Sequence, residues 1–215
     1  MSKNTKPMSK NTKPMSHAEA LTLIKSHPAC ETPDILTVLN PTSASFYDEK
    51  THEFALSLGL DVAAILTNKQ KQVKRATQML NCIRAGLVTD LDYTHTRILL
   101  AMRAAGSYNL NTDAITSLAA NKIMPGVETR GVTRGQINHL FKMSHSIDTV
   151  KSKVSNSIGK NGYMNVLGIV ERKGAKHAEI VFNPAHKFAQ AFFKMIDSAT
   201  DGQLQALAEK GEKIA

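Results

Sequence analysis

The chain has 215 residues, and its 42% hydrophobic content allows a core of ordinary size without disulfides or structural metals. It carries 27 Lys and Arg against 18 Asp and Glu, a formal net charge of +9 that favours an anionic partner over a small neutral substrate. Two cysteines without metal or redox spacing, no signal-peptide pattern and no long apolar stretch predict a cytoplasmic, reduced protein with no membrane span.

The first sixteen residues form a basic tail built on a tandem repeat, MSKNTKP twice, followed by Met15 and Ser16. The tail contains four lysines, no acidic residue and almost no apolar surface, so burial cannot offset the entropy lost on ordering it. We therefore expect residues 1–16 to be disordered. A small in-frame duplication explains the repeat most simply, and a phosphate-binding arm is the alternative.

Helical patterns dominate residues 17–105, which we assign to a helical domain for dimerisation or sensing. Ser16 and Glu19 have the spacing of a capping box before the first apolar run. An irregular connection is expected over 28–50, where turn-forming residues are frequent. Three further helices are predicted over 51–58, 61–86 and 93–105.

A boundary between two domains is predicted over 106–131, which is rich in Gly, Asn and Thr and contains a short helical stretch at 113–121. The second domain then spans 106–198, and 199–215 forms a helical tail. Positive charge is concentrated in this second domain, because 122–194 holds twelve basic and four acidic residues.

Two short amphipathic helices are predicted at the centre of the second domain. The first, over 133–142, begins with the capping-box pair Thr133 and Gln136. A turn over 143–146 separates it from the second, SIDTVKSKVSNSIGK, for which a period of 100° per residue predicts a buried stripe of Ile147, Val150, Val154 and Ile158.

The opposite face of the second helix carries hydroxyl, amide and ammonium groups, with no carboxylate after Asp148. These groups suit contacts with base edges and phosphates in a major groove, and an ordinary solvated face is the alternative. The residues of this face are Thr149, Ser152, Lys153, Asn156 and Lys160.

A hairpin with a basic tip is predicted after this helix, with strands over 166–171 and 177–182. Arg172, Lys173 and Lys176 cluster at its turn, where they would approach the DNA backbone or the minor groove. A helix containing Phe188, Phe192, Met195 and Ile196 on one side follows Pro184.

The order helix, turn, helix, basic hairpin and helix over 131–183 resembles the winged helix-turn-helix domains of bacterial, plasmid and phage regulators. In this resemblance TRGQINHLFK is the supporting helix, SIDTVKSKVSNSIGK the recognition helix and GIVERKGAKHAEIVF the wing. The resemblance implies a mainly α fold with a small β-hairpin. The implied DNA-binding residues are Arg134, Thr149, Ser152, Lys153, Asn156, Lys160, Arg172, Lys173 and Lys176.

Catalysis is not indicated by any motif in the chain. HExxH, GxxxxGK[ST], GxGxxG and GxSxG are all absent, and the eight histidines lack metal-binding spacing. We expect each histidine to be exposed or half-buried, and we expect Asp90 and Asp92 to cap a helix. The prediction is a protein that is not an enzyme and that needs neither cofactor nor metal.

The function expected from the sequence is sequence-specific binding of double-stranded DNA by a homodimeric transcriptional regulator associated with the nucleoid. A plasmid or phage protein for replication initiation or partition, bound to repeated DNA sites, is the main alternative. An RNA-binding protein is a second alternative, disfavoured by a chain with four Tyr, seven Phe and no Trp for base stacking.

Overall fold

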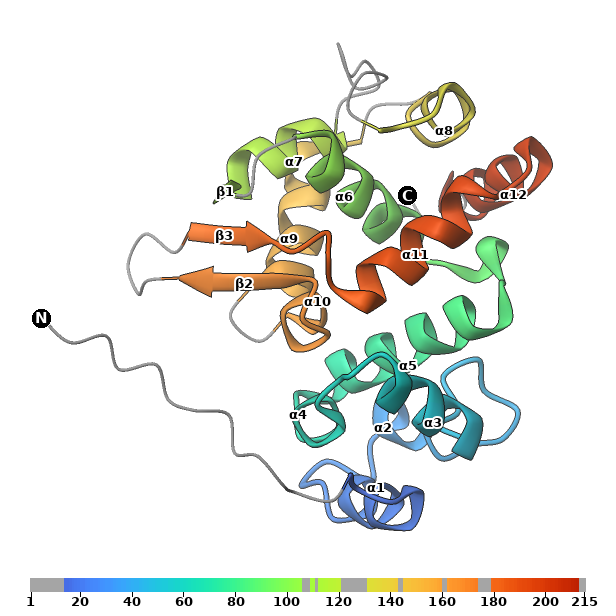
Figure 1. The fold of residues 1–215 in the computed structure, drawn as a ribbon, viewed down its shortest axis with the longest axis vertical. Helices are drawn as coiled ribbons and strands as arrows, with labels where there is room; N and C mark the ends of the chain where they lie inside the picture. Colours follow the sequence, from blue (N-terminus) through green and yellow to red (C-terminus); the bar gives the residue numbers. More distant parts are fainter. Residues whose placement is uncertain are drawn as a thin grey trace, which may run out of the picture.

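The structure, a computed structural model, shows a mainly helical protein with a small antiparallel sheet, as the predicted fold class requires (Figure 1). Residues 1–13, which make up most of the predicted disordered tail, lie outside the described residues. The described residues are 14–105, 109–110, 112–120, 131–142, 145–159, 162–173 and 179–212.

Five helices form the N-terminal part, at the bottom of Figure 1. The predicted capping box is present, because the Ser16 side chain accepts a hydrogen bond from the Glu19 N–H and the Glu19 carboxylate accepts one from the Ser16 N–H. Buried His52 bonds to the Met15 carbonyl at 2.8 Å and ties the start of the described chain to the core. These helices are α1 (His17–Lys25), α2 (Pro33–Leu36), α3 (Glu49–Ser57), α4 (Val62–Leu66) and α5 (Gln70–Ala85).

The prediction of one continuous helix over 61–86 is wrong, because the chain breaks between α4 and α5. The Thr67 hydroxyl donates to the Ala63 carbonyl, and the Asn68 side chain accepts from the next backbone N–H. The Asn68 carbonyl lies 2.8 Å from Nε2 of His27. Such local side-chain bonds compete with helical hydrogen bonds and end the first helix.

The ends of the next elements agree with the sequence prediction. Gly86 ends α5 in the left-handed conformation, with φ of +68°. A short 3-10 turn, η1 (Val88–Asp90), leads to α6 (Tyr93–Ala104). The Asp92 side chain caps α6 by accepting from the His95 N–H at 2.9 Å.

The second half combines helices with three short strands in the order β1-β3-β2, all antiparallel. The predicted first hairpin strand begins too early, because Tyr163 and Met164 are buried in a short helix and the strand starts only at Val170. The elements are β1 (Asn109–Leu110), α7 (Thr112–Ala120), α8 (Arg134–Leu140), α9 (Ile147–Ile158), α10 (Tyr163–Val166), β2 (Val170–Lys173), β3 (Glu179–Phe182), α11 (Lys187–Asp197) and α12 (Asp201–Glu212).

The predicted pairing of α8 with α9 is wrong. Helix α9 packs mainly against α7 and also contacts α6 and α10, whereas α8 packs mainly against α12. In Figure 1, α8 and α12 lie together on the side of the molecule away from the β2–β3 hairpin. The helix that supports α9 is therefore α7, which comes before the predicted supporting helix in the chain.

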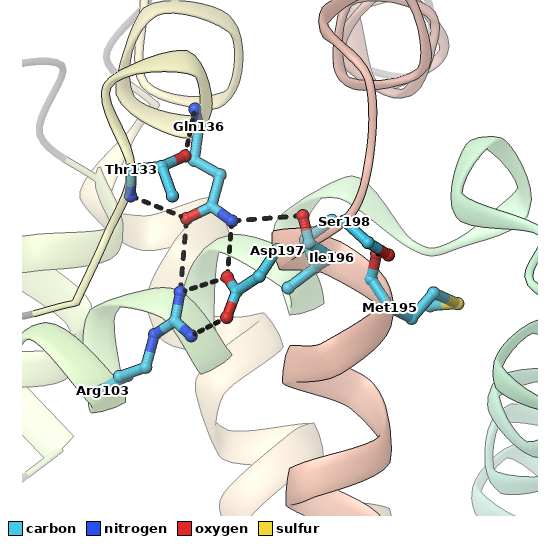
Figure 2. A network of polar contacts seen from close by, with 7 residues as sticks. All are labelled: Arg103, Thr133, Gln136, Met195, Ile196, Asp197 and Ser198. Atoms are coloured by element: carbon cyan, nitrogen blue, oxygen red, sulfur yellow. Dashed lines mark hydrogen bonds and ion pairs between the residues drawn. The ribbon is translucent and has the colours of Figure 1, made fainter.

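A polar network explains why α8 does not pack against α9 (Figure 2). The fully buried Gln136 side chain donates to Asp197 at 2.8 Å and to the Ile196 carbonyl at 3.2 Å. It also accepts from Arg103 at 3.3 Å, and Arg103 makes two further bonds to Asp197 at 2.8 and 2.9 Å. These contacts fix the first turn of α8 between the ends of α6 and α11.

The buried apolar side chains form one cluster that extends from α1 to α12. Helix α12 contributes Leu204, Leu207 and Ala208 to it and packs on η1 and α6 as well as on α8. The described part of the expected C-terminal tail is thus a helix of the core. Of the helices in the described ranges, none is both long and apolar enough to span a membrane.

Candidate nucleic-acid interface

Helix α9 presents a polar face to solvent. Thr149, Ser152 and Asn156 are exposed, as predicted, while Val150, Val154 and Ile158 are buried against neighbouring elements. The Asn156 amide donates to the Ser152 carbonyl within the same helix at 2.9 Å. Asp148, Lys151 and Ser155 are also exposed on α9, and the sequence prediction left Lys151 and Ser155 out of this face.

Ile147 does not join the buried stripe as predicted, because 60% of its surface is exposed. It is the first residue of α9, and the packed stripe begins one turn later at Val150. The start of α9 is instead held by the preceding backbone, where the His145 N–H donates to the Ala120 carbonyl of α7 at 2.8 Å. An exposed apolar side chain thus occupies the first position of α9.

Lys153 differs from the other predicted contacts on α9 because it is only partly exposed and faces α6. Its Nζ lies 3.6 Å from Asp92, the residue that caps α6. Thr149 and Lys153 also line a cavity of about 420 Å³ together with Asp92, His145 and Lys210. The ammonium group of Lys153 is therefore already partly neutralised within the protein.

The hairpin cations are separated by the strand register. Val170 lies opposite Phe182 and Arg172 opposite Ile180, so Arg172 belongs to the inner, apolar face of the sheet. Its Nη1 donates to the Ile158 carbonyl at the end of α9, at 3.4 Å. A cation in this position also complements the helix dipole.

Lys173 is exposed on the outer face of the hairpin, directly opposite Glu179. The described strands therefore do not gather Arg172 and Lys173 into one cationic cluster. Lys176 and Lys160, the two remaining lysines of the predicted interface, lie outside the described residues.

Arg134 is exposed at the first position of α8. Because α8 lies beside α12, away from the hairpin, the structure does not bring Arg134 next to β2 and β3 (Figure 1). The described candidate interface thus consists of the exposed face of α9 and Lys173.

Two histidines are buried, contrary to the sequence prediction. His52 and His95 are each about 3% exposed. His52 lies within hydrogen-bonding distance of the Tyr47 hydroxyl and the Met15 carbonyl, whereas Nδ1 of His95 faces Asp92 at 3.7 Å. Their neighbours along the chain do not distinguish them from exposed histidines, because these partners are set by tertiary packing.

Burial lowers the pKa of His95 to about 4, although Asp92 opposes this shift. Burial also acts to raise the pKa of Asp92, but attraction to His95, the hydrogen bond from the His95 N–H and the charge of Lys153 hold it below its usual value. At neutral pH the pair therefore consists of a neutral imidazole and an ionised carboxylate that also faces Lys153.

Stability is expected to fall as the pH decreases from about 7 to 4, because unfolded His95 binds a proton near its ordinary pKa and the folded form resists it. The loss attributable to His95 is about 3 kcal/mol. Urea unfolding of the wild type and of His95→Gln at several pH values between 7 and 4 measures this loss of unfolding free energy. Parallel curves for the two proteins would show that His95 is not the cause.

Metal binding finds no support in the described part of the chain, which contains no group of three potential ligands close enough to hold an ion. Comparison of the chain with protein-family models, with curated proteins and with solved structures gives no match.

Proposed function

We propose that the protein binds double-stranded DNA by inserting α9 into the major groove, as the recognition helix of a winged-helix unit. The observation that carries this proposal is the exposed face of α9, where hydroxyl, amide and ammonium groups stand opposite a buried apolar stripe. Groups of these kinds read base edges and contact phosphates. The residues of this face are Thr149, Lys151, Ser152, Ser155 and Asn156, with the exposed carboxylate of Asp148 at its N-terminal end.

The surrounding elements support the same proposal. Helices α6 and α7 pack behind α9, and the antiparallel strands β2 and β3 follow it in the chain, with a hydrogen bond from Arg172 that joins β2 to the end of α9. The connection from α7 to α9 contains α8 and is longer than the three to four residues of a standard helix-turn-helix. In this proposal α7 takes the supporting role that the sequence assigned to α8.

A transcriptional regulator that acts as a homodimer is the specific form of this proposal. Dimeric helix-turn-helix proteins place two recognition helices about one DNA turn apart, so a symmetric site accompanies a symmetric protein. Footprinting on selected sequences together with the mass in solution tests this form. One short symmetric site with a dimer supports it, whereas iterated sites favour the replication or partition alternative.

A steep salt dependence of binding to a short random-sequence duplex is the expected result for the nucleic-acid interaction itself. With about two to four phosphate contacts, of which Lys151 and Lys173 supply two, the logarithm of the affinity should fall against the logarithm of salt concentration with a slope of about −2 to −4. Fluorescence anisotropy at several salt concentrations measures this slope, with a hairpin RNA as the comparison. A slope near zero for both nucleic acids would refute the proposal.

A further inference from the structure

A second candidate site lies in a cavity of about 260 Å³ between α5, the start of α6 and α10. Its walls include Lys71 and Arg75 of α5, Asp92 and His95 of α6, and Tyr163 of α10. This volume is slightly below the usual range for small-molecule sites, so only a small ligand fits. The cavity is distinct from the exposed face of α9, so its role is additional to DNA binding.

One wall of the cavity holds a buried polar group without a hydrogen-bond partner. His95 is only 3% exposed, and within the described structure its Nε2 has no such partner. A buried polar atom left in this state costs about 1–3 kcal/mol, so it calls for an explanation such as a ligand. The carboxylate of Asp92, 3.7 Å from Nδ1, favours the tautomer with the proton on Nδ1, in which Nε2 is an acceptor.

The cavity wall carries three carboxylates and three cations, and two lysines from outside the wall add to the positive charge around it. Each carboxylate of the wall has a lysine partner: Asp34 with Lys74 at 3.4 Å, Asp92 with Lys153 at 3.6 Å, and Asp90 with Lys210 at 2.5 Å.

Lys71 and Arg75, in contrast, form no ion pair within 4 Å with any residue that the structure describes, although the charge of Arg75 helps to lower the pKa of Asp92. They lie one helical turn apart on α5, so both cations flank the same side of the cavity.

We propose that this cavity binds a small organic anion that also carries a hydroxyl or amino group. Its carboxylate or phosphate pairs with Arg75 and Lys71, and its hydroxyl or amino group donates a hydrogen bond to Nε2 of His95. Arg75 suits the anionic end because its planar guanidinium donates two parallel hydrogen bonds to either acid group.

The test uses three probes on the full chain: glycerol 3-phosphate, glycerate and glycerol. We expect both anions to shift the side-chain ¹⁵N resonances of His95 with dissociation constants in the millimolar range, and glycerol to shift them far less. The anion that binds more tightly identifies the acid group of the natural ligand. Absence of any shift at His95 with about 20 mM of either anion would overturn the proposal.

Two variants test the anionic end. Arg75→Gln should weaken binding of the preferred anion about tenfold or more, which corresponds to about 1.4 kcal/mol. Lys71→Gln, at an exposed position whose loss does not threaten the fold, should weaken it in the same direction. The matched control is Lys25→Gln, an exposed lysine at the end of α1 that does not line the cavity. Unchanged affinity in both test variants would refute the assignment. None of these measurements involves DNA, so their outcome is separate from that of the proposed function.

Discussion

Replacing Asn156 by Ala is expected to weaken binding to the preferred DNA site by on the order of 1–3 kcal/mol and to change binding to random DNA much less. Asn156 is exposed on α9, and its amide bonds only within its own helix in the described structure, so it can turn to pair with an adenine edge. Anisotropy titrations on a selected site and on random DNA measure the difference.

The cations of the same surface should behave differently. The double replacement of Lys151 and Lys173 by Ala should weaken binding to both DNAs about equally and flatten the salt slope by about two units, if each lysine contacts a phosphate as proposed. Arg134→Ala is the matched control, since it removes an exposed cation from α8. If the lysine pair changed sequence preference and Asn156→Ala changed nothing, the roles assigned to α9 and the hairpin would be wrong.

Replacing Gln136 by Leu is expected to destabilise the protein by about 2–4 kcal/mol, because it removes the centre of the buried network in Figure 2. The variant leaves the Ile196 carbonyl without its side-chain donor and removes one acceptor of Arg103. For a chain of this length, the expected fall in Tm is about 10 °C. Thermal unfolding followed by circular dichroism measures this change.

Gln205→Leu is the control for this experiment, because Gln205 is exposed on α12 and bonds only to Glu209 in the described structure. Its effect should stay within about 0.5 kcal/mol. At a temperature where the Gln136→Leu variant remains folded, the DNA affinity of this variant should equal that of the wild type, since α8 lies outside the candidate interface. Equal Tm values for the two variants would show that the network contributes little to stability.

Local signals in the sequence predicted the elements well. Both capping boxes, the left-handed end of α5 at Gly86 and the cap of α6 at Asp92 depend on residues within a few positions of each other. The stripe of Val150, Val154 and Ile158 follows from helical periodicity alone. These features set the helix ends and show which side of α9 is buried.

Partners distant in the sequence could not be predicted in this way. An apolar stripe requires a neighbour but does not specify which one, so α8 was paired with α9 although Gln136 binds Arg103 and Asp197. The strand register could not be predicted from the sequence either. The register places Arg172 toward α9 and Lys173 on the outer face. The polar face of α9 was thus predictable, whereas the set of cations beside it was not.

The position of α12 has a consequence for folding during synthesis. Helix α8 packs mainly on α12, yet Arg134–Leu140 leaves the ribosome well before Asp201–Glu212. At roughly 5–20 residues per second, the apolar side of α8 waits on the order of ten seconds for its partner. Throughout that interval the surface of α8 that α12 covers in the finished protein is available to chaperones and to other nascent chains.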